Sequence, residues 1–337
     1  RRISSCADAE RGPLRVKRSL ESGMTSKTGR KTSTSPTPVD QEVCLLGVTR
    51  LSDFIEFVRE KAVDGRDIDE GMLVETWRKA AVVFAGLQVS EAGAADKPEV
   101  KPLSKRLQAH VRKLASLPNF QASFPAVPVS FGMVELDKLI VSQRHITQSS
   151  VQKMTRSLRA PLSETDLAEL CLPLTPDTAG FGIALEENGR YVFASDTHDA
   201  RFLGAKLLRP TDIKGHAVGG HVQAVLALSV GFTTNVLNVV RFGQRMVLNN
   251  GYHRAVALRK LGVTHAPCLI QVCSNWEEVG LAGSQEVYHN ASVYFTAPRP
   301  PLLRDYANPA LTKTFGTVRR RKQITLTYEV DTAQLAV

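Results

Sequence analysis

Five consecutive residues, Asn250, Gly251, Tyr252, His253 and Arg254, combine residue types that bind anions. The glycine lets the backbone approach a ligand closely, and it precedes a predicted helix whose first amides have no partner within the helix. Such amides attract phosphate and carboxylate groups. The arginine adds paired hydrogen bonds, and the histidine can donate a hydrogen bond or titrate. The stretch therefore predicts an anion site. The alternative is a simple turn with the histidine and the arginine exposed to solvent.

The segment around these residues, "VLNNGYHRAVALRKLGVTHAPCLI" at 247–270, predicts the elements that position them. It has the pattern of a strand, an Asn-Gly turn, a short helix that ends at a glycine, and a second strand. Upstream, residues 127–146 predict a strand that leads into a helix over 148–158, which Ser149 or Ser150 is expected to cap.

Two hairpins and a further helix complete the predicted domain. One hairpin is expected to turn at Asn188 and Gly189, which tolerate the positive φ angles of a tight turn, and the other at Gly243. A helix is expected over 163–171. This order of elements indicates an α+β domain over 127–285.

Helices dominate the predicted region before this domain. Apolar residues at helical spacing predict helices over 50–63 and 69–87, and Ser104 is the expected cap of a third. A polar linker is expected over 90–102. We assign 41–126 to this helical region, whose apolar faces are expected to pack against the rest of the protein.

The net charge of +10 is concentrated in two short segments. The first is residues 1–40, where nine Lys and Arg stand against four Asp and Glu in a stretch rich in Ser, Thr and Pro. Such a composition predicts a disordered basic tail. Met24 is a candidate start of the native chain, which would leave residues 1–23 outside it.

The second basic segment lies in the predicted C-terminal extension over 286–337. It contains a cluster of four residues, Arg319, Arg320, Arg321 and Lys322, in a sequence that predicts a strand. Two interpretations are open: the side chains protect the edge of a sheet, or they contact an anion or a nucleic-acid backbone.

Composition and cysteine spacing limit the class of protein. The 337 residues are 43% hydrophobic, which is enough for a buried core, and no apolar run approaches the roughly 20 residues of a membrane span. The five cysteines form no CxxC pair, a usage typical of a reducing compartment. We therefore expect a cytoplasmic protein of bacterial type with no membrane partner.

The segment 247–270 resembles the signature of the ParB/sulfiredoxin superfamily. In that signature a strand ends in a G-x-H-R or G-x-x-R turn, a helix of the form R-x-x-A-x-x-x-L-G follows, and a strand containing proline closes the unit. The matching residues here are Gly251, His253, Arg254, Ala257, Leu261, Gly262 and Pro267. The upstream "VELDKLIVSQRHITQSSVQKM" resembles the family's early element, a strand that ends in a polar Q-x-R or Q-R segment before a short helix.

The resemblance implies a ParB-like N-terminal domain, that is, a compact α+β nucleotide-binding fold. A nucleoside triphosphate such as CTP or ATP, with Mg²⁺, would place its phosphates at the helix terminus from Gly251 to Arg254. Gln143 and Arg144 would lie on the facing wall.

The sequence departs from this family at three places. Tyr252 replaces the reactive cysteine of the sulfiredoxins, so phosphoryl transfer through that cysteine is not expected. The spacing between the two matching segments exceeds the family's, and residues 180–230 are expected to form an insertion. ParB proteins carry an E-N-x-x-R motif and a helix-turn-helix after this domain, and neither is recognisable here.

A metal-dependent hydrolase is a separate alternative. Asp196, His198 and Asp199 are close in sequence, and His216 and His221 are five residues apart. These are side chains that bind zinc and related metals. The spacing of the second pair does not place both histidines on one face of a helix, and the Gly-Gly pair between them predicts a loop. We therefore assign no metal site.

Together these patterns predict a nucleotide-binding protein that acts in a DNA-linked process such as plasmid, phage or chromosome maintenance. One alternative is a nucleotide-using enzyme of the same fold, either a small-molecule phosphotransferase or a nuclease. Another is a protein-interaction module whose pocket is vestigial. The sequence predicts neither the identity of the nucleotide nor the oligomeric state.

Overall fold

The structure is a computed structural model that describes residues 39–158, 161–175, 181–186, 189–196, 200–212 and 220–334. The predicted basic tail lies outside the described residues, except for Val39 and Asp40, which begin the first strand. The predicted α+β class is confirmed, because helices and several sheets are interspersed along the chain. Every helix in the described ranges is too short or too polar to cross a membrane.

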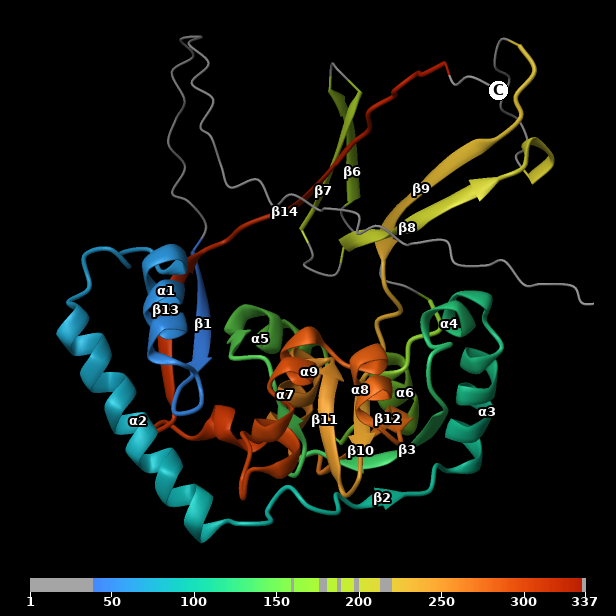
Figure 1. Cartoon of the computed structure of the whole chain (residues 1–337). Coiled ribbons are helices and arrows are strands. Elements are labelled where there is room, and N and C mark those ends of the chain that lie inside the picture. The colour runs from blue at the N-terminus through green and yellow to red at the C-terminus, as the bar shows by residue number, and fades with distance from the viewer. Residues whose placement is uncertain are drawn as a thin grey trace, which may run out of the picture. The chain divides into compact units, whose positions relative to one another are not determined.

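A six-stranded mixed sheet forms the centre of the predicted domain (Figure 1). Its strands in spatial order are β2 (Val100–Lys101), β3 (Val129–Glu135), β12 (His265–Cys273), β10 (Asn238–Phe242), β11 (Arg245–Asn250) and β4 (Ile140–Val141). The hairpin predicted to turn at Gly243 is confirmed by the pairing of β10 with β11. β12 runs parallel to β10 and antiparallel to β3. These central strands are buried along most of their length, as their nearly continuous apolar sequences require.

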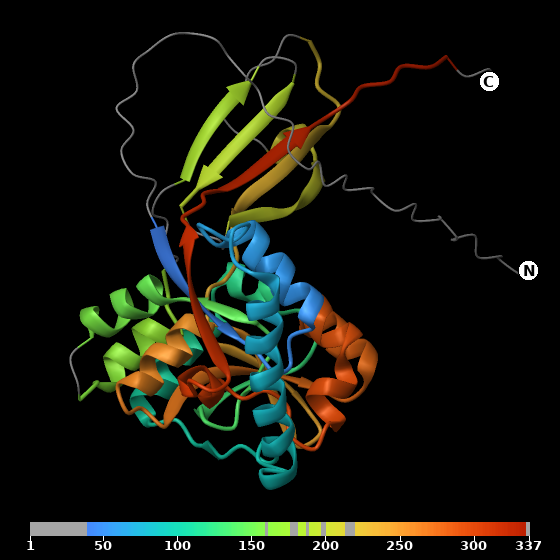
Figure 2. The same ribbon diagram turned by 90° about the vertical axis from the view of Figure 1, so that its left-hand side faces the viewer.

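A second sheet joins three distant parts of the chain. Its strands in spatial order are β13 (Thr312–Val318), β1 (Val39–Leu45) and β5 (His145–Thr147). β1 is antiparallel to both neighbours, with Glu42 opposite Phe315 on one side and Thr147 on the other. Figure 2 shows β1 in blue and β13 in red. The region predicted as helical over 41–126 therefore begins with a strand, and this strand pairs with segments that we had assigned to two other regions.

The region predicted as an insertion contains strands of two smaller sheets. One sheet consists of β14 (Lys322–Thr327), β7 (Arg190–Ser195) and β6 (Phe181–Glu186), and the other of β8 (Ala200–Leu208) and β9 (Val225–Phe232). β6 and β7 form the other predicted hairpin. Gly189 has a φ of 70°, while Asn188 lies outside the described residues. β14 is an edge strand, which agrees with the edge-protecting interpretation of Lys322.

The six predicted helices are all present in the described ranges, together with three helices that were not predicted. They are α1 (Leu51–Lys61), α2 (Glu70–Ser90), α3 (Lys105–Ala115), α4 (Pro118–Ser123), α5 (Gln148–Ser157), α6 (Glu164–Cys171), α7 (Tyr252–Lys260), α8 (Trp276–Ala282) and α9 (Gln285–His289). Short turns of 3-10 or π helix occupy Pro210–Asp212, Ser292–Thr296 and Leu303–Ala307. The predicted cap of α3 is confirmed, since Ser104 Oγ accepts from Leu107 N at 3.2 Å. The predicted cap of α5 is wrong: the helix begins after Thr147, and Ser149 donates to Asp40 instead.

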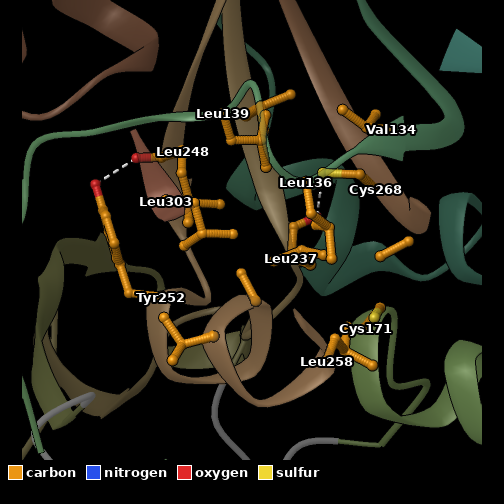
Figure 3. Packing of buried hydrophobic residues seen from close by; sticks show 14 of the residues in the cluster. Val134, Leu136, Leu139, Cys171, Leu237, Leu248, Tyr252, Leu258, Cys268 and Leu303 are labelled. Carbon is orange, nitrogen blue, oxygen red and sulfur yellow. Dashed lines mark hydrogen bonds between the residues drawn. The ribbon is translucent and has the colours of Figure 1, made fainter. Parts of the chain in front are cut away.

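The main hydrophobic core includes residues of the six-stranded sheet, α6 and α7 (Figure 3). Leu136, Leu237 and Leu258 contribute to it, and each is at most 1% exposed. Cys171 and Cys268 lie in the same core as free thiols. Burial raises the pKa of the Cys171 thiol to about 12, so this group behaves as a small apolar side chain.

A buried ion-pair network fixes the C-terminal segment to the end of α2. Arg299 is 1% exposed, and its Nη2 donates to Asp305 Oδ1 at 2.6 Å and to Glu91 Oε2 at 3.0 Å. Arg304 reaches the same Glu91 oxygen at 2.6 Å. Because a buried charge is costly unless it is paired, these contacts hold the segment that leads into β13.

Replacement of Arg299 by methionine should lower the free energy of unfolding by about 3–5 kcal/mol, because the buried Asp305 carboxylate loses its counter-charge. Arg304→Met is the matched control. Arg304 pairs with the same Glu91 but is 32% exposed, so its loss is expected to cost at most about 1 kcal/mol. Urea denaturation measures both, and equal losses would contradict the role given to Arg299.

Candidate ligand-binding cavity

One cavity of about 650 Å³ gathers most of the residues predicted to bind a ligand. The predicted residues in its wall are Gln143, Asn250, Gly251, Tyr252, His253, Arg254, Arg319 and Arg320. The two arginines at the end of this series were predicted as part of a separate basic cluster. The fold therefore brings two separately predicted sets of residues to one site, of a size typical for small-molecule ligands.

Gly251 explains why α7 begins where it does. Its φ of 95° lies in the left-handed region that L-residues avoid. A Cβ atom at this position would lie 2.7 Å from Leu237 Cδ1, which is too close for van der Waals contact. The amide of Gly251 donates to Asn250 Oδ1 at 2.8 Å, so the asparagine side chain supports the turn. The backbone itself therefore requires glycine here.

Tyr252 is a core residue whose ring touches the cavity. It is 7% exposed, its hydroxyl lies 2.8 Å from Ser142 Oγ, and the same hydroxyl donates to the carbonyl oxygen of Leu248 (Figure 3). Burial raises the pKa of this hydroxyl, which keeps it protonated as a donor. Tyr252 thus anchors the start of α7 to β11 and to the residue after β4.

Arg254 is not the exposed clamp that its position in the first helical turn suggests. It is 6% exposed, and its Nη1 donates to the carbonyl oxygens of Leu170 at 3.0 Å and Asn235 at 2.8 Å. Its Nη2 donates to Asn235 Oδ1 at 2.5 Å. The expected exposure is therefore wrong: the guanidinium ties α7 to α6 and to the segment before β10.

His253 contacts the edge strand β5. Its Nε2 accepts a hydrogen bond from Thr147 N at 3.0 Å. A ring nitrogen that accepts a hydrogen bond carries no proton, so the imidazole is neutral in this arrangement. His253 therefore links α7 to the three-stranded sheet beside the cavity without adding positive charge.

Gln143 and Arg144 were expected on one wall, but they line two different cavities. Gln143 lines the 650 Å³ cavity, and its Nε2 donates to the carbonyl oxygen of His145 at 2.6 Å. Arg144 lines a second cavity of about 360 Å³, together with Ser142 and Glu286. Neighbouring residues of an extended chain point to opposite sides, which accounts for the separation.

Arg144 is held by residues of the C-terminal segment. Its Nη2 donates to Tyr294 Oη at 2.8 Å and to Glu286 Oε1 at 3.3 Å, and its guanidinium carbon lies 5.7 Å from the centre of the Tyr294 ring. Its Nη1 is buried and has no hydrogen-bond partner within the described part of the chain. The assignment of Arg144 to the predicted nucleotide site is therefore corrected to the second cavity.

The basic cluster is divided between the cavity and internal contacts. Arg319 and Arg320 line the cavity, and Arg320 Nη2 also donates to a backbone carbonyl of α1 at 2.8 Å. Arg321 instead pairs with Asp196, with 2.6 Å between Nε and Oδ1, and Lys322 begins β14. Two of the four predicted nucleic-acid contacts thus belong to the candidate ligand site.

Our sequence interpretation missed the wall that β1 and β5 contribute. Asp40 and Glu42 from β1 and His145 and Thr147 from β5 line the cavity, and His145 Nδ1 lies 2.7 Å from Glu42 Oε2. The period-two placement of these side chains is a strand signal. In "VDQEVCL" that signal was overlooked because the segment adjoins the polar tail.

The acidic side chains in the wall have internal partners. The pairs are Asp40 with Ser149, Glu42 with His145, and Asp196 with Arg321. By contrast, Lys61 and Arg319 form no ion pair with any described residue. The cavity therefore retains positive charge that favours an anionic ligand.

The structure describes only part of the set of residues that we considered as metal ligands. His198, Asp199 and His216 lie outside the described residues. Within the described ranges, no three His, Cys, Asp or Glu side chains gather closely enough to hold a metal ion.

Comparison of the chain with protein-family models, with curated proteins and with solved structures finds no significant match. The resemblance of 247–270 to the ParB/sulfiredoxin signature therefore stays a prediction. Function has to be argued from the cavity itself.

Gly251→Ala should lower the free energy of unfolding by about 2–5 kcal/mol, because it adds a left-handed alanine and overpacks against Leu237. Gly243→Ala is the matched control: its φ of 58° is also left-handed, but nothing lies within 4 Å of an added Cβ. Only the backbone cost of roughly 1–2 kcal/mol is expected there. Thermal denaturation compares the two variants, and an equal loss would mean that Leu237 moves aside at no cost.

Arg254→Ala should lower the free energy of unfolding by about 2–4 kcal/mol, because buried carbonyl groups lose their donor and a cavity remains. Arg259→Ala is the control on the same helix. Arg259 is 30% exposed and pairs with Asp137 at the surface, so its loss should cost at most about 1 kcal/mol. If urea denaturation gives Arg254→Ala the small loss of the control, the internal role of Arg254 is wrong.

Proposed function

We propose that this protein binds a nucleoside triphosphate in the 650 Å³ cavity. One observation carries the proposal: the N-terminus of α7 and the residues Arg319 and Arg320 line the same cavity. A helix N-terminus and arginine side chains both favour phosphate groups. A triphosphate offers three such groups to these donors, whereas a carboxylate ligand offers one.

The remaining wall suits the other parts of a nucleotide. Gln143 and Asn250 provide amide groups for a base or sugar, and Phe57 provides an apolar ring. Asp40 or Asp196 would coordinate a Mg²⁺ ion bound with the phosphates, because this ion is usually coordinated by one or two carboxylates besides phosphate oxygens and water. CTP and ATP both fit this description.

We extend the proposal to a DNA-linked process on two grounds. The first is the resemblance to ParB proteins, and the second is the basic pair Arg321 and Lys322, which lies next to the arginines of the cavity in sequence. The alternative of a nucleotide-using enzyme is favoured by a different observation, which is the paired Glu42 and His145 in the cavity wall.

The double substitution Arg319→Gln and Arg320→Gln should weaken binding of the preferred nucleotide at least about 10-fold, because a hydrogen bond to a charged group contributes about 1.5–3 kcal/mol. Lys105→Gln with Lys313→Gln is the control. It removes the same charge from two exposed positions outside the cavity wall, and binding should be unchanged. Calorimetric titration with CTP, ATP, GTP and UTP measures the affinities.

The outcomes separate the parts of the proposal. If both double variants lose the same affinity, the arginines act only through the net charge of the protein and not through contacts in the cavity. Binding of none of the four triphosphates by the parent protein would refute nucleotide binding. Repeating the titration in the presence of duplex DNA tests the proposed role in a DNA-linked process. This role requires either that DNA changes the affinity for the nucleotide or that the protein binds DNA through Arg321 and Lys322.

A further inference from the structure

β8 and β9 form an antiparallel ribbon (Figure 1), and one of its faces is made entirely of apolar side chains. Leu207 is opposite Leu226 and Ala205 is opposite Leu228, and a bulge at Leu203 shifts the alternation of β8 by one residue. Opposite residues share a face, and side chains alternate along each strand. The face that contains Leu207, which we call the apolar face, therefore consists of Ala200, Phe202, Ala205, Leu207, Leu226, Leu228, Val230 and Phe232.

The charged residues of the ribbon lie on its other face. Arg201 is opposite Gly231 and Lys206 is opposite Ala227, which places both basic side chains on the side away from the apolar face. β9 contains no charged residue along its whole length. One face of the ribbon is thus uncharged and the other is basic.

The apolar face is covered at one end of the ribbon and exposed at the other. Phe181 of β6 packs edge-on against Phe232, with 5.7 Å between the ring centres. Farther along the ribbon, Leu226 is 61% exposed and Leu207 is 70% exposed. Contiguous apolar surface of this kind marks an interaction site in a soluble protein. A two-stranded ribbon is also only marginally stable by itself, so a partner that covers the face would stabilise it.

We infer that this chain forms a symmetric dimer in which the apolar face packs against the same face of a second copy. A symmetric dimer brings identical patches together, so the face has to be complementary to itself. The apolar face meets this condition, because it brings no charge into the interface and leaves no buried charge without a partner. Arg201 and Lys206 of both copies then lie on the outer sides of the dimer. Two ribbons packed in this way form two layers of sheet, a common arrangement that buries an apolar sheet face.

Other occupants fit the apolar face less well. The 38 residues before β1 are rich in Ser, Thr, Pro and basic residues, a composition that buries little apolar surface. A membrane with anionic lipids attracts basic side chains to the side of the protein that it contacts, whereas Arg201 and Lys206 are on the side away from the apolar face. The inference is independent of the nucleotide cavity, because no residue of β8 or β9 lines that cavity.

Sedimentation equilibrium of the full chain tests the inference. The parent should have twice the mass of one chain. Leu207→Lys with Leu226→Lys should raise the dissociation constant of the dimer at least about 100-fold, because each dimer exchanges four apolar side chains for charged ones. Val82→Lys with Val89→Lys is the matched control. These valines of α2 are 73% and 83% exposed, so the same change outside the ribbon should leave the dimer intact.

Several results would overturn the inference. Interfaces of standard size have dissociation constants in the µM range or below, so a parent that is monomeric at about 100 µM contradicts it. Equal weakening by both lysine double variants would assign the effect to net charge. A monomeric parent that floats with phosphatidylserine vesicles, and loses this binding in Leu207→Lys with Leu226→Lys, would assign the face to a membrane. If that variant fails to fold, Leu207→Thr with Leu226→Thr decides, because threonine keeps the strand propensity: a parental dissociation constant rejects the apolar face as the interface.

Discussion

Strand β1 must satisfy its backbone hydrogen bonds on both edges, and the candidate site depends on this requirement. Its partners, β13 and β5, come from the end and the middle of the chain. An unpaired backbone group is costly when buried, so β1 fixes both partners beside it. The pairing places Asp40 and Glu42 next to His145, and it delivers the two arginines that follow β13 to the same cavity. The polar wall of the site is thus a consequence of strand order.

The junction between β11 and α7 shows that residues with reactive side chains can have structural roles. Tyr252 and Arg254 direct their polar atoms to internal carbonyl groups, and His253 accepts an amide hydrogen from β5. These contacts make the start of α7 rigid. What the junction offers a ligand is its backbone, and the cationic residues Arg319 and Arg320 come from elsewhere in the chain. A helix N-terminus with arginine residues beside it is a common arrangement for recognising phosphate.

The parts of the fold that local patterns determine could be predicted from the sequence. The turn at Gly243 and helix α6, capped by Ser163, follow from the residue types at adjacent positions. β1 could not be placed in this way, because its partners are remote and its own pattern is short. The burial of Arg254 depends on carbonyl groups of Leu170 and Asn235, which reach it only after the helices have packed. The local pattern therefore located residues that line the cavity, but it wrongly predicted that Arg254 is exposed.

The four residues that follow β4, 142–145, separate the two cavities. Ser142 and Arg144 line the smaller cavity, while Gln143 and His145 line the larger one. A rigid partition that tilts toward one compartment also changes the width of the other. Thermodynamic reciprocity then sets the result: a molecule in one compartment that alters affinity in the other by some factor has its own affinity altered by the same factor. The two cavities are thus separated by only four residues of backbone, and any coupling between their ligands obeys this reciprocity.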